Sequence, residues 1–197
     1  MSKAEHSNVT KLETQNLDAL VELQRSKFRE EGEVTYTKRV DRLKRLKAMI
    51  IENKKEFAIT TKREFNGARS YEFSLFSEFA SKVEAIDYSL KHLNDWMKSE
   101  RRKTNKPMNF LGGRSEVRYF PKGVIGIISP WNLPFGLTVS PLTSALAAGN
   151  RAMLKPSEHV PETAALFAEV VPNYFPADEV SVVTGGQDIS QKFAELP

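Results

Sequence analysis

Cysteine is absent from all 197 positions of the sequence. This absence excludes disulfides, thiolate metal ligands and a cysteine nucleophile within the chain. Long apolar runs are absent as well: no stretch reaches the roughly 18 residues at which a membrane-spanning helix is predicted, and the N-terminus has no apolar signal-peptide core. The sequence therefore predicts a cytoplasmic protein with no membrane segment.

Proline is absent from residues 1–106, and all ten prolines lie from Pro107 onward. Since proline interrupts helices, the first part of the chain can form long helices, whereas the second part is repeatedly punctuated. We predict three regions on this basis. They are a helical N-terminal region over residues 1–106, a loop with a half-exposed strand over 107–122, and an incomplete βαβαβ region over 123–197.

Glycine-rich phosphate loops are also missing. The sequence contains neither G-x-G-x-x-G nor G-x-x-x-x-G-K-[ST]. The three histidines, His6, His92 and His159, are scattered along the chain. No metal site is predicted from them, and no Ser-His-Asp set can be assigned.

Positive charge exceeds negative charge in the first part of the chain but not in the second. Residues 1–118 hold 25 Lys or Arg against 18 Asp or Glu, whereas residues 119–197 hold 4 against 7. A basic half raises nucleic acid as a partner. The charges interleave in sign along the polar faces of helices, which favours an ordinary solvated surface, so no nucleic-acid partner is expected.

Apolar residues recur at helical spacing through the N-terminal region. They predict helices over about residues 14–30 and 40–57, with a stop at Asn66-Gly67, and Ser70 is placed to cap a third helix. The third helix carries an aromatic stripe that could stack on nucleic-acid bases, but one continuous buried face is favoured. The stripe comprises Phe73, Phe76, Ala80, Val83, Ile86, Leu90, Leu93 and Met97. The cations of residues 101–103 suit the end of that helix.

Short apolar runs separated by small-residue helices follow in the C-terminal region. Residues 124–128 are β-branched and nearly continuous, as in a strand buried on both faces of a parallel sheet. Two further strands are predicted over 152–155 and 180–184, with helices over 139–148 and from Pro161 onward. Two β-α-β units imply a parallel sheet with right-handed crossovers. The predicted fold is α/β, with a partial doubly wound sheet that leaves one edge uncovered.

Polar side chains follow the first two of these strands, where ligands bind in open α/β sheets. Asn132 lies between Pro130 and Pro134, and Trp131 is expected to anchor the loop by burial. A rigid loop with one carboxamide suits a hydrogen-bond donor to an oxyanion. The alternative is an asparagine that only caps the turn.

Lys155 and Glu158 follow the second strand, three positions apart. A lysine and a carboxylate at this spacing can bracket a diol such as a ribose. They can equally form a surface ion pair of little energetic value. The residues alone leave both interpretations open.

Three motifs in register carry a family resemblance: Pro130-Trp131-Asn132-Leu133-Pro134, then Ala148-Gly149-Asn150, then Lys155-Pro156-Ser157-Glu158. With their lead-in over residues 121–128, they resemble the NAD(P)-dependent aldehyde dehydrogenase superfamily. The compact turn at residues 182–186 and the sequence Ile128-Ser129-Pro130-Trp131-Asn132 look most like its coniferyl-aldehyde and class 3 branch, which acts on aromatic or fatty aldehydes.

The resemblance implies an NAD(P)-binding half of the family fold and specific roles for residues. Asn132 would donate its amide N–H to the tetrahedral oxyanion formed by the aldehyde. Glu158 would disfavour a 2′-phosphate, so NAD is expected and NADP is possible. The cofactor would contact Ile128, Ser129, Pro130, Trp131, Lys155, Ser157, Glu158 and Gly185 or Gly186. A full-length member would be a homodimer or homotetramer acting on a small aldehyde.

The departures from the family pattern are as informative as the matches. The family's nucleophilic cysteine, its glutamate and its Gly-rich turn beside the pyrophosphate have no counterpart in these residues. The chain is expected to be an N-terminal fragment of about two-fifths of a family member, inactive on aldehydes by itself. The alternative is a non-catalytic fragment that docks onto a full-length homologue.

Overall fold

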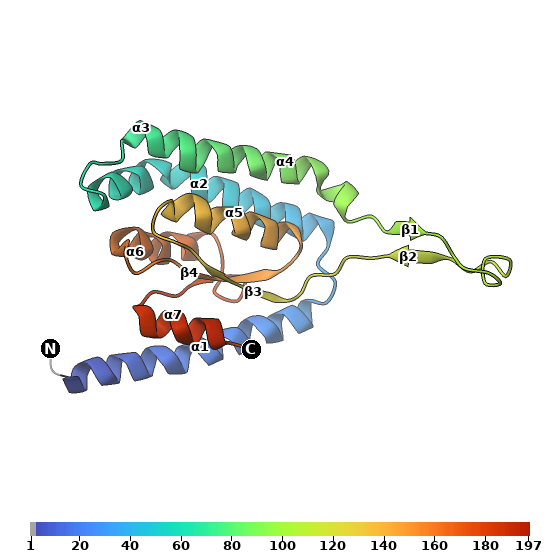
Figure 1. The fold of residues 1–197 in the computed structure, drawn as a ribbon, viewed down its shortest axis with the longest axis horizontal. Helices are drawn as coiled ribbons and strands as arrows, with labels where there is room; N and C mark the ends of the chain where they lie inside the picture. The colour runs from blue at the N-terminus through green and yellow to red at the C-terminus, as the bar shows by residue number, and fades with distance from the viewer. Residues whose placement is uncertain (1–2) are drawn as a thin grey trace.

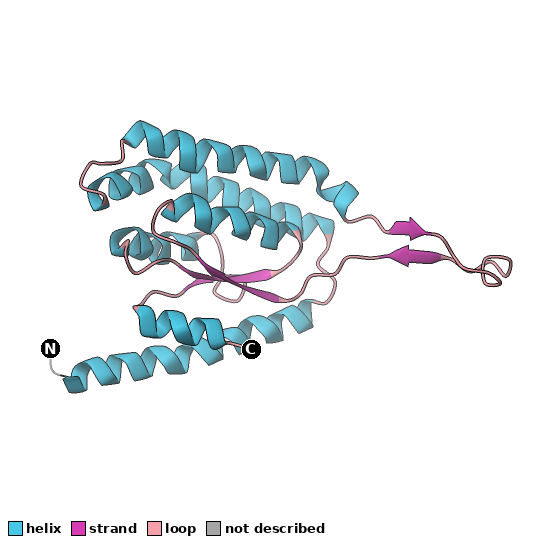
Figure 2. Cartoon of the chain, viewed as in Figure 1, coloured by secondary structure: helices cyan, strands magenta, loops and turns pink. Residues whose placement is uncertain are grey.

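A computed structural model describes the backbone of residues 3–197 and the side chains of residues 17–197 (Figures 1 and 2). No helix of the described residues is long and apolar enough to cross a membrane. The N-terminal helices are α1 (Lys3–Glu31), α2 (Tyr36–Glu64), α3 (Tyr71–Ser74), the π-helix η1 (Leu75–Ala80) and α4 (Ser81–Trp96). The remaining elements are β1 (Glu100–Arg102), β2 (Ser115–Val117), β3 (Val124–Ile128), α5 (Pro134–Ala147), β4 (Arg151–Lys155), α6 (Pro161–Val170), the 3-10 helix η2 (Val171–Asn173), β5 (Val180–Val182) and α7 (Gln187–Glu195).

The strands β3, β4 and β5 form one parallel sheet in that order. The register pairs Val124 with Arg151 and Ile128 with Lys155, and Ala152 with Val180. The helices α5 and α6 are the crossovers and lie on one side of the sheet, with α2 and α4 beyond them, while α1 and α7 cover the other side (Figures 1 and 2). The predicted α/β class with a partial parallel sheet is confirmed.

The strand β3 differs from the prediction in its burial. It was expected to be buried on both faces, but within residues 3–197 it pairs on one side only, with β4, and Ile128 is 54% exposed. The strand β4 is buried at all five positions because it has a neighbour on each side. A β-branched run therefore identified a strand without identifying its place in the sheet.

An aromatic cluster fills the main core between the sheet-covering helices and α2. The ring of Phe135 on α5 lies 4.7 Å from Phe57, 4.4 Å from Phe79 and 5.5 Å from Phe167, measured between centroids. These rings come from α2, η1, α5 and α6, and each is almost completely buried. Burial of one such side chain contributes about 1.5–3 kcal/mol, so this cluster fixes the four helices together.

Buried ion pairs join α1 and α2 to the start of β4. The Glu31 carboxylate accepts hydrogen bonds from Arg42 and Arg151, with closest distances of 2.8 and 2.9 Å. Burial acts to raise the pKa of Glu31, but the hydrogen bonds from Arg42 and Lys38 outweigh it and lower that pKa. The carboxylate therefore stays charged and links three elements at the end of the sheet opposite the candidate site.

The predicted buried stripe of the third helix is wrong over its first turns. Phe73 is 53% exposed and Phe76 is 80% exposed, whereas Glu78 and Phe79 are buried. The π-helix η1 interrupts the stripe, and its wider i→i+5 turn offsets the residues before it from the buried face of α4. The stripe faces the core only in α4, where Ile86 and Leu93 are buried.

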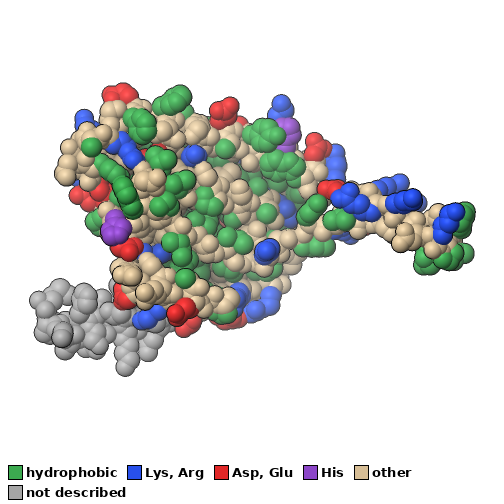
Figure 3. Space-filling view, viewed as in Figure 1, with side chains coloured by type: hydrophobic (Ala, Val, Ile, Leu, Met, Phe, Trp, Pro, Cys, Tyr) green, Lys and Arg blue, Asp and Glu red, His purple; other side chains and the backbone are tan. Residues whose placement is uncertain are grey.

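The strands β1 and β2 pair antiparallel and form an arm that projects from the body (Figure 1). The cations at residues 101–103 were assigned to a helix end, but α4 ends at Trp96 and residues 100–102 form β1. Large apolar side chains of the arm are exposed: Met108, Phe110, Leu111, Tyr119 and Phe120. Figure 3 shows hydrophobic side chains gathered at the tip of the arm and Lys and Arg along it.

Candidate functional site

The carboxyl end of β4 places a buried ammonium beside a partly exposed carboxylate. Lys155 is 1% exposed, and its Nζ donates to the Pro156 carbonyl oxygen at 2.9 Å and lies 3.5 Å from Glu158 Oε2. The Glu158 side chain is 32% exposed. The pKa of Glu158 is lowered chiefly by a hydrogen bond from its own backbone N–H, with the charge of Lys155 adding to the effect and burial opposing it. This pair is a fixed ionic group, unlike an exposed surface pair.

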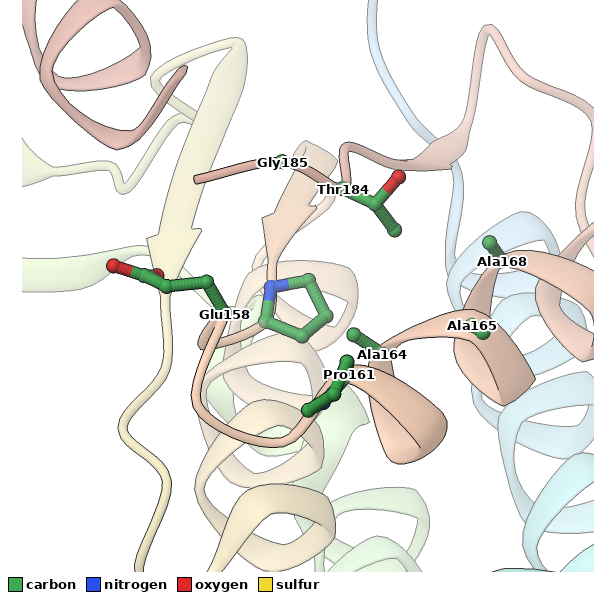
Figure 4. Close-up of a pocket in the computed structure, with 8 residues that line it drawn as sticks. Glu158, Pro161, Ala164, Ala165, Ala168, Thr184 and Gly185 are labelled. Carbon is green, nitrogen blue, oxygen red and sulfur yellow. The ribbon is translucent and has the colours of Figure 1, made fainter. Parts of the chain in front are cut away.

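A cleft of about 470 Å³ opens next to this pair. Figure 4 shows Glu158 on the loop after β4 and Thr184 and Gly185 on the loop after β5, with three alanines of α6 along the other side. The lining residues are Pro156, Glu158, Pro161, Ala164, Ala165, Ala168, Thr184 and Gly185. The alanine side chains are short and apolar, so this wall of the cleft is smooth and a flat ring can lie against it.

The chemistry of this cleft fits the adenosine part of a dinucleotide. Small apolar side chains provide a surface for a purine, and the Glu158 carboxylate at the edge can accept hydrogen bonds from ribose hydroxyls. The ammonium of Lys155 lies behind this carboxylate and holds it in place. The residues of the described chain therefore fit the group that the resemblance implies.

Gly185 has a backbone conformation that only glycine adopts readily, with φ of +141°. A Cβ at this position would lie 2.6 Å from Cγ1 of Ile189. The glycine thus allows α7 to pack directly against the turn that follows β5. Gly186 has an extended conformation and is the N-cap of α7, and it does not line the cleft.

The loop after β3 lies apart from this cleft. Ser129 is buried: its N–H donates to the Lys155 carbonyl oxygen at 3.1 Å, and its Oγ lies 2.6 Å from Oγ1 of Thr138. Trp131 was expected to anchor the loop by burial, but it is 53% exposed. Its ring instead stacks on Phe65 at a centroid distance of 6.3 Å. The anchor is a ring-on-ring contact at the surface.

Asn132 is exposed at the entrance to α5, and its side chain makes no hydrogen bond with any residue from 17 to 197. The alternative that Asn132 only caps the turn has no hydrogen bond of its side chain to support it among residues 17–197. The first N–H groups of α5 bind the carboxylate of Glu78 from η1, since Phe135 and Gly136 donate to Glu78 Oε2 at 2.9 and 3.0 Å. The Asn132 amide is free to bind a ligand.

Comparison with known proteins assigns the chain to a family. A family model described as the aldehyde dehydrogenase family matches residues 2–197. The chain belongs to the aldehyde dehydrogenase family. This assignment confirms the resemblance carried by the motifs around Asn132 and Lys155.

Curated relatives of this aldehyde dehydrogenase family chain are much longer than it is. A coniferyl aldehyde dehydrogenase from a Pseudomonas species is 39% identical over 168 residues, which cover 85% of this chain and 34% of the relative. A probable coniferyl aldehyde dehydrogenase from Pseudomonas aeruginosa is 37% identical, covering 94% of this chain and 38% of the relative. The chain thus spans somewhat over a third of their length.

Solved aldehyde dehydrogenases share the fold. The structure of a substrate-bound Staphylococcus aureus AldH superposes with a TM-score of 0.84 at 26% identity, covering 91% of this chain and 38% of that one. An NAD+ complex of a Bacillus cereus aldehyde dehydrogenase has a TM-score of 0.72 at 26% identity, covering 87% and 34%. The α/β sheet with its covering helices is therefore the N-terminal part of the family fold.

The structure separates the implied site residues of this aldehyde dehydrogenase family chain into two groups. Lys155, Glu158 and Gly185 lie at one cleft or directly behind it. Ser157 is 9% exposed, and its Oγ accepts a hydrogen bond from the His159 N–H at 3.2 Å. Its hydroxyl therefore stabilises the loop after β4. The second group comprises the residues that neither line this cleft nor pair with Glu158: Ile128, Ser129, Pro130, Trp131, Asn132, Ser157 and Gly186.

Sequence reasoning missed part of the cleft and the residues that hold the Asn132 loop. Ala164, Ala165 and Ala168 recur at helical spacing after Pro161, a pattern of small residues on one helix face that signals a close approach. Arg69 and Glu78 carry no comparable signal, because Arg69 reaches the Asn132 carbonyl and Glu78 reaches the N-terminus of α5 from more than fifty positions away in the sequence. Among the described residues, no cluster of His, Asp or Glu could hold a metal ion.

Proposed function

We propose that this chain is the N-terminal cofactor-binding part of an NAD-dependent aldehyde dehydrogenase that oxidises aromatic aldehydes of the coniferyl type to carboxylic acids. The overall change is aldehyde, NAD+ and water to acid, NADH and a proton, with the nicotinamide accepting the hydride. Membership of the family and relatives named coniferyl aldehyde dehydrogenase support this proposal. Fatty aldehydes are the second substrate class.

The observation that carries the proposal is the buried Lys155 ammonium held against Glu158 at the mouth of an apolar cleft. In the proposed site, Glu158 accepts the ribose hydroxyls of the adenosine half, and Lys155 fixes Glu158. The purine lies against the alanines of α6. Asn132 donates its side-chain N–H to the oxyanion that develops on the aldehyde carbon.

The charge of Glu158 favours NAD over NADP in this proposal. A ribose 2′-phosphate would place a second negative charge beside the carboxylate, whose lowered pKa keeps it ionised at neutral pH. A mouse relative, 33% identical over 175 residues, is named an NADP-preferring dimeric aldehyde dehydrogenase. Both cofactors therefore belong in the binding experiments.

A binding experiment on the 197-residue chain tests the cofactor site. Nuclear magnetic resonance titration with NAD+ should shift the backbone amides of Glu158, Thr184 and Gly185, with a dissociation constant no tighter than about 1 mM. Lys155→Met should abolish these shifts. The matched control is Lys98→Met, which removes a lysine from an exposed Asp95–Lys98 pair of the same i,i+3 spacing.

A chimaera tests the oxidation. Residues 1–197 should replace the matching N-terminal third of the Pseudomonas coniferyl aldehyde dehydrogenase. We expect NADH formation with coniferyl aldehyde, and Asn132→Ala should lower kcat by roughly 100- to 1,000-fold. An active chimaera with an unaffected Asn132→Ala variant would remove Asn132 from the proposal. A soluble but inactive chimaera would refute the family function for these residues.

The isolated chain should not oxidise aldehydes, because none of its 197 residues is the cysteine that the family uses as nucleophile. NADH formation by the purified chain would contradict this.

A non-catalytic role, in which the chain docks onto a full-length homologue, is favoured by the arm, where Phe110 and Leu111 are 74% and 76% exposed. Co-purification of this chain with a full-length relative would support the docking role, provided that the Phe110→Ser variant no longer co-purifies. The same result would support a homodimer or homotetramer for the complete protein.

A further inference from the structure

A buried carboxylate caps α5 from another helix. Glu78 on η1 is 1% exposed, and its Oε2 accepts from the N–H groups of Phe135 and Gly136. The N-cap residue Leu133 offers no side-chain acceptor, and Pro134 has no N–H to satisfy. The wide turn of η1 points Glu78 at the helix N-terminus, where the positive end of the helix dipole favours an anion.

Arg69 connects this carboxylate to the loop that carries Asn132. One Arg69 nitrogen lies 2.9 Å from Glu78 Oε1, and the other donates to the carbonyl oxygen of Asn132. Its guanidinium also lies 4.3 Å from the ring centre of Phe65, the ring on which Trp131 stacks. The Arg69 side chain is 13% exposed; its contact with Glu78 is partly buried, whereas its contact with the Asn132 carbonyl lies at the surface.

The Asn132 side chain itself has no partner among residues 17–197. Its direction is therefore set by the backbone, and among residues 17–197 the Arg69 side chain donates to the backbone carbonyl of this residue. A displaced loop carries the amide away from the position where an oxyanion forms. A displacement of about 1 Å of a catalytic group costs roughly 100-fold in rate.

We propose that Arg69 is a positioning residue for Asn132, held by the Glu78 carboxylate that also caps α5. Arg69 does not touch the substrate; it acts by fixing the Asn132 carbonyl between two rigid elements. The catalytic consequence rests on the proposed function of Asn132. The structural consequence does not, so the two are tested separately.

The structural arm uses the 197-residue chain itself. The protein has two tryptophans, so Trp96→Phe leaves Trp131 as the only reporter. In this background, Arg69→Met should raise the quenching of Trp131 fluorescence by acrylamide toward that of a free indole. The increase should be roughly twofold, because Trp131 is already 53% exposed. Arg69→Lys should restore part of the protection. Arg63→Met is the control, because Arg63 pairs with Glu162 at the surface of the same helix end.

The catalytic arm uses the chimaera. Arg69→Met should lower kcat by roughly 10- to 100-fold and leave the KM for NAD unchanged, because the adenosine cleft lies elsewhere. In the Asn132→Ala background the same change should have no further effect on kcat, since a residue that acts through Asn132 has nothing left to position. Arg69→Lys should recover part of the rate.

The outcomes separate the two proposals. Unchanged Trp131 quenching in Arg69→Met overturns the positioning role whatever the chimaera does. Equal losses of kcat in the wild-type and Asn132→Ala backgrounds also overturn it, because they indicate a general structural defect. A chimaera that is inactive before any Arg69 change refutes the proposed function, and the quenching experiment then still decides on Arg69.

Discussion

The loop after β3 and the loops after β4 and β5 hold the two parts of the candidate site by different means. The β4 loop leaves a strand that is buried at every position, and its lysine, serine and glutamate are held by contacts within five residues of one another. The β3 loop leaves an edge strand, with Ile128 54% exposed. It is held by Phe65, Arg69 and Glu78, which lie on other elements.

This difference separates two ways of building a rigid site. A loop whose polar groups bind one another is stable wherever its strand is stable. A loop that depends on a distant arginine and carboxylate keeps its geometry only while those elements stay packed. Changes at Glu78 should therefore disturb the β3 loop and spare the β4 loop, and changes at Lys155 should do the reverse.

The largest effect is expected for Glu78→Ala. The change leaves the buried N–H groups of Phe135 and Gly136, and the partly buried Arg69 guanidinium, without their carboxylate. Loss of one member of such a buried network costs about 3–5 kcal/mol in the free energy of unfolding. Urea unfolding followed by circular dichroism measures it, with Glu84→Ala on the exposed face of α4 as the control. A loss below about 1 kcal/mol would show that solvent replaces the cap.

A smaller effect is expected for Gly185→Ala, in the turn after β5. The residue has φ of +141°, and the new Cβ would lie 2.6 Å from the Ile189 side chain. We expect a loss of about 1–3 kcal/mol, since strain and a steric conflict combine. Gly186→Ala is the matched control because its φ is −77° and its nearest neighbour is a movable Asp188 oxygen. Equal losses at the two glycines would contradict this account.

The sequence was sufficient to predict the elements that rest on local pattern. Its prolines, small-residue helices and β-branched runs placed β3, β4 and β5, and the parallel order confirmed the two β-α-β units. Ser70 caps its helix as predicted, with its Oγ accepting from the Phe73 N–H at 3.0 Å. These features depend on neighbours within a few residues of the chain.

The features that sequence could not supply depend on distant partners. The aromatic stripe from Phe73 was predicted to be buried, but η1 shifts the helix so that Glu78 faces the core. A π-turn is stabilised by what its side chains meet, here the N-terminus of α5. Trp131 stacks on Phe65 for the same reason: the partner lies 66 positions earlier, beyond the reach of local periodicity.

Lys155→Met should change stability little, although Lys155 is one of the most buried side chains. The methionine fills a similar volume, and Glu158, 32% exposed, can be solvated once its partner is gone. We expect a change below about 1 kcal/mol in urea unfolding, together with the loss of the NAD-dependent shifts. A destabilisation as large as that expected for Glu78→Ala would contradict this account, because it would show that solvent does not replace the lysine at Glu158.

The smallest effect is expected in the pH dependence of Glu158→Gln. The pKa of Glu158 is lower in the folded protein than its ordinary value of 4.5, mainly because its own backbone N–H binds the carboxylate. A carboxylate whose pKa is lower in the folded protein than in the unfolded chain stabilises the fold at pH values above the unfolded pKa. This stabilisation is lost as the pH falls through the folded pKa. The wild-type melting temperature should therefore exceed that of Glu158→Gln at neutral pH, and the difference should shrink below pH 4.5 and vanish below the folded pKa.

Salt distinguishes this carboxylate from an ordinary surface pair. The pKa of Asp95 is also lowered, by a hydrogen bond from Lys98, but both side chains are about two-thirds exposed. The stability difference of Asp95→Asn should disappear in about 1 M salt, where charges are screened within about 3 Å. That of Glu158→Gln should persist, because its main partner is a backbone N–H fixed by the loop after β4. If both differences vanish together, the β4 loop is held no more firmly than an exposed ion pair.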